Sequence, residues 1–495
     1  MNSKLAYTLA VLLLFTVSPV CAHAQQDTIR ISLEEAIYES SVNSVDAMVA
    51  RNEFQTSYWT FKTYRAELLP EVVLDGTLPY YSKSYNQFQN TDGTYTFVGN
   101  DYSRFDAGIS ISQNIPWTGA KLSVESNLQR LNQYGDNPKR QYMLMPVAVT
   151  LEQPILGFNR VKWMQKIEPV KYKEAQARLV SQLENVTITA ISYYFNLLLG
   201  EMNFGIATQN YKNTEHLYAI AEAKRKIGQI SENELLQLKL SCLKAEAYVT
   251  EARSLLKASM FQLRSFLGYK EEVVLVPVIP DLLAKLYLNY DEVLRLALEN
   301  SPFTQEIQRR QLEAMRNVSQ AKSERWNASL FLSFGLSGQD DHMPQIFDNL
   351  RGNQVVNMGL RIPLLDWGRG KGRVKVAESN HEVVQSRIEK EEIDFKQQIF
   401  LQVENFNNQS MQVSIAEETD RVAQRRYETS MEAFILGKID LLNFNDAQTS
   451  KDEAKRKYIE EMYRLWSYYY QIRSITLYDF INNTDLFAKM MRDYE

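Results

Sequence analysis

Several short segments of the chain alternate between apolar and polar residues with a period of two. In SLFLSFGLSG (329–338) four large apolar residues alternate with serine and glycine, and FDAGISISQNI (105–115) repeats the pattern. VVLDGTLPYY (72–81) and VVNMGLRI (355–362) are similar. This period predicts strands with one apolar face. Alternation alone fits a soluble sandwich as well as a barrel wall with lipid outside and water inside.

Two further alternating segments occur only in the first half of the chain. They are KLSVESNLQ (121–129) and YMLMPVAVT (142–150). Turn-forming residues at 134–138 lie between them. We therefore expect an extra hairpin at about 120–150.

Long segments with helical periodicity follow the strands. From about 169 to 227 and from about 373 to 436 the sequence contains almost no glycine or proline. In the second segment, apolar residues recur at spacings of three, four and seven, the period of packed helices. Sixty helical residues span roughly 90 Å. Because another long helical segment follows each one, the sequence predicts two long helical hairpins.

The two halves repeat one order of elements. LEEAIYESSVNS (33–44) resembles YDEVLRLALENS (290–301) in its apolar positions, and each opens an expected helix of about 30 residues. Strands, a long helix, a tight turn and a returning helix follow in both halves. We interpret the chain as a first repeat over 25–286, which contains the extra hairpin, and a second repeat over 287–495.

The N-terminus has the features of a secretory signal. Lys4 precedes an apolar stretch, and Ala22-His23-Ala24 forms a small-x-small cleavage site, so residues 1–24 are predicted to be removed. Cys21 raises a lipoprotein alternative, but the larger Val20 before it favours simple cleavage. Cys242 then remains as a single cysteine, so no internal disulfide is expected.

Charge and hydropathy narrow the class of protein. The net charge of −5 gives no support to nucleic-acid binding. After the signal, no apolar run of 18 residues predicts a membrane-spanning helix. A closed barrel of alternating strands stays possible for such a chain.

Both tight turns carry the same helix-ending and helix-starting signals. Gly228 is placed to take the left-handed conformation that ends a helix, and Ser231 with Glu234 has the spacing of a capping box. Gly437 and Asp440 repeat this pattern, with asparagine in place of the glutamate. Such turns are good connectors, and they also form exposed tips at which a partner can dock.

Signals of catalysis are weak. The four histidines are widely scattered, and no nucleotide-binding, zinc-protease or hydrolase motif occurs. GRGKGRVK (368–375) lacks the phosphate-loop spacing, and Asp340-Asp341-His342 is more typical of an exposed loop than of a metal site. We expect no enzyme activity, no metal and no cofactor. A secreted structural coiled-coil protein is the alternative interpretation, although it leaves the alternating strands unexplained.

Taken in order, these segments resemble the TolC family of outer-membrane efflux and export channels over essentially the whole mature chain. The resemblance lies in the duplicated order, the LEEAI start, LEQPILGFNR (151–160), RIPLLDWGRGKGRV (361–374) and the paired turns. It implies an α+β membrane protein with tandem coiled-coil hairpins, in which three chains form a periplasmic helical tunnel and a shared transmembrane β-barrel in the outer membrane.

The resemblance also implies partners and sites. The homotrimer, in contact with outer-membrane lipid, would passively conduct substrates from an inner-membrane transporter joined through a periplasmic adaptor, with efflux favoured over type I protein secretion. The positions that match the family's adaptor-docking turns are Gly228, Gln229, Ile230, Ser231, Gly437, Lys438, Ile439 and Asp440. Asn443 and Asp446 match its periplasmic gate, where asparagine departs from the family's aspartate.

The extra hairpin departs further from the family pattern. Two strands per repeat would give a twelve-stranded trimeric barrel. The additional pair could lengthen a hairpin, enlarge the barrel or form a surface loop, and our expectation is the common barrel.

Overall fold

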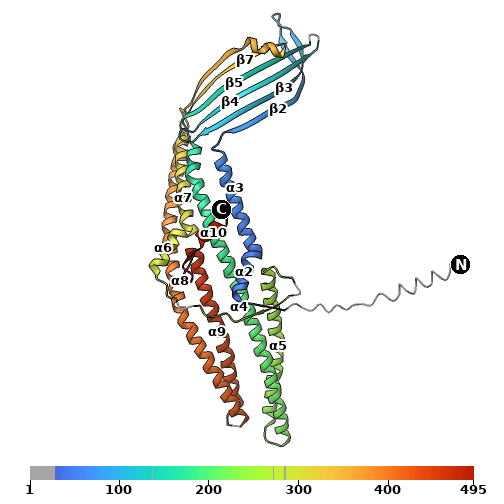
Figure 1. The fold of residues 1–495 in the computed structure, drawn as a ribbon, viewed down its shortest axis with the longest axis vertical. Helices are drawn as coiled ribbons and strands as arrows, with labels where there is room; N and C mark the ends of the chain where they lie inside the picture. Colours follow the sequence, from blue (N-terminus) through green and yellow to red (C-terminus); the bar gives the residue numbers. More distant parts are fainter. Residues whose placement is uncertain (1–27, 136–137, 271–272, 284–285, 437, 495) are drawn as a thin grey trace, which may run out of the picture. The chain divides into compact units, whose positions relative to one another are not determined.

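The computed structural model describes residues 28–135, 138–270, 273–283, 286–436 and 438–494 (Figure 1). The predicted signal peptide at 1–24 and Gly437 lie outside these residues. The helices are α2 (Leu33–Asn43), α3 (Val45–Ala66), α4 (Arg160–Lys226), α5 (Glu232–Phe266), α6 (Tyr290–Asn300), α7 (Pro302–Ser323), η1 (Met343–Asn349), α8 (Arg369–Ile435), α9 (Leu441–Thr476) and α10 (Leu486–Tyr494). The strands are β1 (Thr28–Ile31), β2 (Glu71–Gln89), β3 (Tyr95–Ile115), β4 (Ala120–Tyr134), β5 (Lys139–Leu156), β6 (Val274–Pro277), β7 (Asn327–Asp340), β8 (Arg351–Arg361), β9 (Tyr478–Asp479) and β10 (Thr484–Asp485).

The chain divides into two compact units, and α3, α4, α8 and α9 contribute to both. The first unit comprises Met1–Met48, Val186–Ala284 and Gln409–Ser467; the second comprises Val49–Asn185, Lys285–Asn408 and Tyr468–Glu495. No helix in the described part of the chain is both long and apolar enough to cross a membrane.

The second unit contains one six-stranded antiparallel sheet with the order β2-β3-β4-β5-β7-β8 (Figure 1). Every segment with a period of two in the sequence is part of this sheet. The predicted extra hairpin supplies β4 and β5, which form the centre of the sheet instead of a surface loop. The expectation of four strands per chain, and with it the twelve-stranded barrel, is therefore not supported by the observed sheet.

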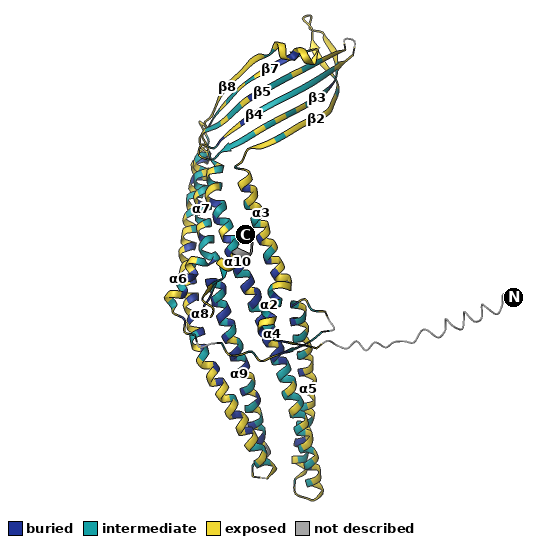
Figure 2. Ribbon diagram, viewed as in Figure 1, coloured by how far each residue is buried: buried dark blue, intermediate teal, exposed yellow. Residues whose placement is uncertain are grey.

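One face of the sheet is apolar and the other is polar or small. Along one register row the facing residues are Val72, Ile111, Val124, Val149 and Phe334. All five are exposed in the single chain. Figure 2 shows that the edge strands β2 and β8 are exposed (yellow) along most of their length. The adjacent row on the other face consists of Glu71, Ser112, Ser123, Thr150 and Ser333. A sheet that exposes its apolar face does not bury a core of its own on that side.

The helix that opens each repeat is shorter than expected. A break at Ser44 separates α2 from α3, and a break at Ser301 separates α6 from α7. The hydroxyl of Ser44 accepts from the N–H of Ala47 at 3.1 Å, and that of Ser301 accepts from the N–H of Phe303 at 3.2 Å. Each serine therefore caps a new helix, and the Ser-Pro pair at 301–302 is the sequence signal for it.

The long helices begin earlier than predicted, because side chains before them cap their first turns. Asn159 Oδ1 accepts from the N–H of Lys162 at 2.9 Å, so α4 starts at Arg160 and contains Pro169. Asp366 accepts from the N–H groups of Gly368 and Gly370, so α8 starts at Arg369. These backbone hydrogen bonds hold the pKa of Asp366 below its ordinary value. Each helix has 67 residues, or about 100 Å.

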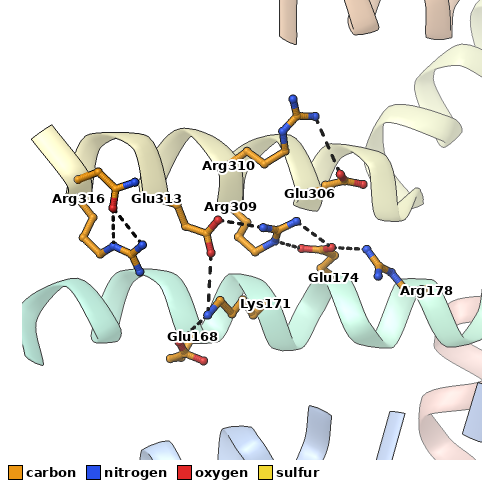
Figure 3. A network of polar contacts seen from close by, with 10 residues as sticks. Glu168, Lys171, Glu174, Arg178, Glu306, Arg309, Arg310, Glu313 and Arg316 are labelled. Carbon is orange, nitrogen blue, oxygen red and sulfur yellow. Dashed lines mark hydrogen bonds and ion pairs between the residues drawn. The ribbon is translucent and has the colours of Figure 1, made fainter. Parts of the chain in front are cut away.

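Ion pairs join α4 to α7 in the second unit (Figure 3). The carboxylate of Glu174 lies 2.6 Å from Arg309 Nε and 2.5 Å from Arg178 Nη2. Arg309 also contacts Glu313, which lies 3.9 Å from Lys171. Glu174 is buried, and a buried carboxylate needs partners of this kind. The network thus fixes a first-repeat helix against a second-repeat helix.

The first unit has its core where α4 meets two short strands. β1 pairs in parallel with β6. The hydroxyl of Tyr194 donates to the carbonyl of Ile31 at 3.1 Å and accepts from the N–H of Val278 at 3.0 Å. Burial raises the pKa of Tyr194 to about 12, so the phenol stays protonated and keeps these bonds.

Candidate functional site

The first helical turn, between α4 and α5, is closed by Gly228. Its φ of +75° lies in the left-handed region, and, its two chain neighbours aside, no described residue has an atom within 4 Å of a Cβ placed there. The N–H of Gly228 donates to Arg225 O, and that of Gln229 donates to Lys224 O, both at 3.0 Å. These bonds satisfy the last carbonyls of α4 and end the helix.

Ser231 starts the returning helix with a complete capping box. Its hydroxyl accepts from the N–H of Glu234 at 3.2 Å, and Glu234 Oε2 accepts from the N–H of Ser231 at 2.7 Å. The bonds from Ser231 hold the pKa of Glu234 below its ordinary value. The turn is therefore specified by its own residues.

Large apolar side chains surround the first turn on its surface. Ile227 is exposed immediately before Gly228, and Leu236, Leu240 and Leu243 are exposed on α5. Their spacing of four and three residues places the three leucines on one face of the helix. Gln229 is exposed and Ile230 is half-buried. An apolar helical stripe without a cover in the chain is a contact surface for another chain.

The second turn, between α8 and α9, has a different cap. The N–H of Lys438 donates to Ala433 O at 2.8 Å, and the carboxylate of Asp440 accepts from the N–H of Asn443 at 2.9 Å. The amide of Asn443 also donates to this carboxylate at 2.7 Å. Asn443, a candidate gate residue, thus lies in the cap of α9.

Apolar residues are exposed here as well. Ile435, Leu436 and Leu442 are more than half exposed around the turn, and Ile439 is half-buried. Both candidate docking turns therefore combine capping hydrogen bonds with exposed aliphatic side chains.

Asp446, the other candidate gate residue, is paired within its own chain. Its carboxylate lies 2.5 Å from Arg426 Nη2 of α8, and Arg426 also donates to Ser450 Oγ at 3.2 Å. Both charged side chains are at least half exposed. The pair thus partly neutralises Asp446 while leaving it open to ions.

Polar contacts connect the two hairpins within the first unit. Asn210 Nδ2 donates to Asp452 at 2.6 Å, and Asn213 Nδ2 donates to the hydroxyl of Tyr427 at 3.0 Å. Lys451 lies 3.1 Å from Asp452 and stands over the ring of Tyr427. Burial raises the pKa of Tyr427. No sequence pattern predicts the contacts of Asn210 and Asn213, because each joins residues more than 200 positions apart.

A cavity of about 600 Å³ lies between the two hairpins of the first unit. α4 and α5 line one side, and α9 lines the other through residues that include Phe444, Thr449 and Arg456. The lining is mixed, with asparagine, serine and lysine beside leucine and alanine.

Among the described residues, no group of three histidine, cysteine or acidic side chains is arranged to hold a metal ion. At the segment considered in the sequence, Asp340 accepts from the N–H of His342 at 3.0 Å. Asp341 lies 3.5 Å from Lys139. These contacts belong to a loop after β7.

Comparison with known proteins identifies the fold. Residues 293–479 match the sequence model of the outer membrane efflux protein family. No curated protein matches the chain in sequence.

Three solved outer-membrane proteins illustrate the structural likeness. The CmeC outer membrane channel of Campylobacter jejuni is 14% identical with a TM-score of 0.66, covering 93% of this chain and 88% of CmeC. The outer membrane protein VceC of Vibrio cholerae is 14% identical with a TM-score of 0.59, covering 90% of this chain and 95% of VceC. The MtrE outer membrane channel of Neisseria gonorrhoeae is 14% identical with a TM-score of 0.58, covering 90% of this chain and 88% of MtrE. The predicted resemblance is confirmed: the chain has the TolC-like fold over most of its length, and its residues 293–479 match the model of the outer membrane efflux protein family.

Proposed function

We propose that three copies of this protein form a channel through the outer membrane that passively conducts small molecules out of the cell. The observation that carries this proposal is the exposed apolar face of the sheet, opposite a face of polar and small residues such as Ser112, Ser123 and Gly108. A wall between lipid and water needs this distribution, because charged and polar groups are costly on the lipid side.

Tryptophans at one end of the sheet support its placement in a membrane. Trp117 connects β3 to β4, Trp326 precedes β7, and Trp367 lies between β8 and α8. All three are exposed, Trp117 and Trp367 by more than four fifths. Tryptophan is enriched at membrane interfaces because its ring is apolar and its N–H is polar. This end of the sheet would lie at the inner interface, facing the periplasm.

The open edges of the sheet support the proposed assembly with further copies of the chain. Among the described residues, β2 and β8 each pair with a strand on one side only. In lipid, the unpaired backbone groups of an open edge cost several kcal/mol each, so the edges need strands from other chains. Trimers of this kind are what the TolC-like fold implies.

The helical turns are the proposed contacts with a periplasmic adaptor, which would couple the channel to an inner-membrane transporter. Ile227 and Leu236 at the first turn, and Leu436 and Leu442 at the second, are uncovered by the chain itself. Efflux is favoured over protein secretion because the matching family is named for efflux.

A deletion strain tests this proposal. Without the protein, cells should accumulate a fluorescent efflux dye, and restoring the gene should restore dye export. If the dye is exported normally while one secreted protein disappears from the medium, the channel serves secretion. If the protein is recovered in the soluble fraction and forms no pores in a planar bilayer, the alternative of a structural coiled-coil protein holds.

A further inference from the structure

Resting on the proposed channel function, we propose that the hairpin β4–β5 is part of the barrel wall and that three copies close a barrel of eighteen strands. The sheet of each chain supplies six strands. The hairpin would then set the width of the outer mouth and admit bulkier substrates than a twelve-stranded barrel.

The first support is the chemistry of the two inserted strands. Val124 of β4 faces Ile111 of β3 and Val149 of β5, which in turn faces Phe334 of β7. The apolar row therefore crosses the inserted hairpin without interruption. A surface flap or a plug would not need one face matched to lipid.

The polar face is equally continuous. Ser123 of β4 faces Ser112 and Thr150, and Thr150 faces Ser333 of β7. Thr150 and Ser333 are within hydrogen-bond distance at 3.4 Å. Because a slip by one residue would exchange the two faces, this agreement across four strands fixes the register of the hairpin within the wall.

The bases of the two first-repeat hairpins are built alike. Gln113 near the end of β3 donates to Leu68 O, in the connection before β2, at 2.8 Å. Gln153 near the end of β5 donates to Thr118 O, in the connection before β4, at 3.1 Å. Each glutamine amide also lies within 2.8 Å of the next residue's carbonyl. The segments ISQNIPWTG (111–119) and LEQPILGFN (151–159) share this glutamine and a following Pro. Thus β4–β5 repeats the design of β2–β3.

The directions of the strands allow sheets from neighbouring copies to pair into a closed barrel. Adjacent strands of the sheet are antiparallel, so adding two strands leaves β8 opposite in direction to β2. The edge β8 of one copy can therefore pair antiparallel with β2 of the next, as it could without the hairpin. A second copy of this chain therefore completes the barrel wall at each edge of the sheet.

The size of the opening follows from the strand number. Barrel diameter grows roughly linearly with the number of strands, so eighteen strands give about one and a half times the diameter of twelve. Barrels of 16–18 strands leave an open aqueous channel.

Paired cysteines test the wall assignment in the full-length protein reconstituted into vesicles. Cys242 is free and is replaced by serine to provide the background. Val124→Cys and Ser123→Cys probe the two faces of β4, and Ile111→Cys and Ser112→Cys are the matched controls on β3. In one set of samples, each cysteine carries a fluorophore, and the loss of its fluorescence in brominated lipid measures contact with lipid. In a second set, the rate at which a water-soluble methanethiosulfonate labels each free thiol measures contact with water.

We expect lipid quenching at residue 124 to match that at residue 111, and aqueous labelling at residue 123 to match that at residue 112. If the β3 pair behaves this way and the β4 pair does not, the inserted hairpin lies outside the wall and the inference is overturned while the channel stands. If the β3 pair also fails, the proposed function itself is wrong. Native mass spectrometry of the extracted assembly counts the copies, and a dimer would overturn the eighteen-strand count.

Discussion

The sheet and the helical turns are specified in different ways. At the first turn, the N–H of Gly228 donates to Arg225 O, and Ser231 and Glu234 satisfy each other's backbone N–H groups. All these bonds lie between residues 225 and 234, so the local sequence determines the structure. In the sheet, the row through Ile111, Val124 and Phe334 joins residues more than 200 positions apart and remains exposed in the single chain. The turn is complete in one chain, whereas the sheet requires an apolar environment and further chains.

The largest expected effect comes from placing a charge on the exposed apolar face. Val124→Arg should destabilise the membrane-inserted protein by about 2–4 kcal/mol if this residue lies near mid-depth. The control Glu125→Arg changes the neighbouring residue on the polar face and should cost much less. The temperature at which half of the extracted oligomer dissociates measures the loss of stability in each of the two variants. Equal losses in the two variants would contradict the assignment of the faces.

Excising the inserted hairpin should narrow the mouth without abolishing assembly. Deleting 120–156 joins Gly119 to Gly157, and the chain is already close at this point, since Asn159 Nδ2 donates to Pro116 O at 2.8 Å. β3 runs in the direction of β5 and can take its place beside β7. The diameter of the largest polymer that enters from the outer side should fall to about two thirds of its value in the full-length protein. An unchanged limit would show that the hairpin does not set the width.

A smaller effect is expected when the first turn is strained. Gly228→Val forces a β-branched residue into the left-handed region, at a cost of about 1–3 kcal/mol. It should weaken binding of the adaptor, measured with the purified partner, and leave membrane insertion intact. Gly205→Ala is the control, because Gly205 lies inside α4 and a Cβ added there meets open space. This substitution should stabilise the helix slightly. Loss of the oligomer in Gly228→Val alone would mean that the turn serves assembly instead of docking.

Charge at the candidate gate should shift ion selectivity. In a bilayer recording, Asp446→Asn leaves Arg426 without its carboxylate and should lower the preference for cations, whereas Arg426→Gln should raise it. The two opposite shifts distinguish a gate charge from a general loss of structure. If neither variant alters the reversal potential, the pair is away from the ion path.

The smallest effect is the pH dependence of the capping box. The pKa of Glu234 is lowered in the folded protein, so its contribution is present above the ordinary value of 4.5 and is lost as the pH falls through the lowered value. Amide hydrogen exchange of residues 231–236, corrected for the intrinsic pH dependence, should accelerate in acid. The same segment in Glu234→Gln should show no such dependence.

The sequence predicted the sheet segments, the long helices and the caps at Gly228 and Ser231, because alternation, helical period and capping are local patterns. It did not predict the partners of Asp446 or Asp452, because Arg426 and Asn210 lie on other helices and no spacing rule connects them. The place of the extra hairpin in the centre of the sheet was also missed. Its strands alternate like the others, but their neighbours are set by pairing with β3 and β7. The docking and gate assignments, and the boundaries of the repeats, stay predictions.

In the proposed assembly, several chains close one membrane channel. The most direct measurement is the gel mobility of protein from isolated outer membranes, with and without heating in detergent. We expect a band near three times the chain mass in the unheated lane and a single-chain band after heating. A single-chain band in both lanes, with the protein absent from the membrane fraction, would contradict it.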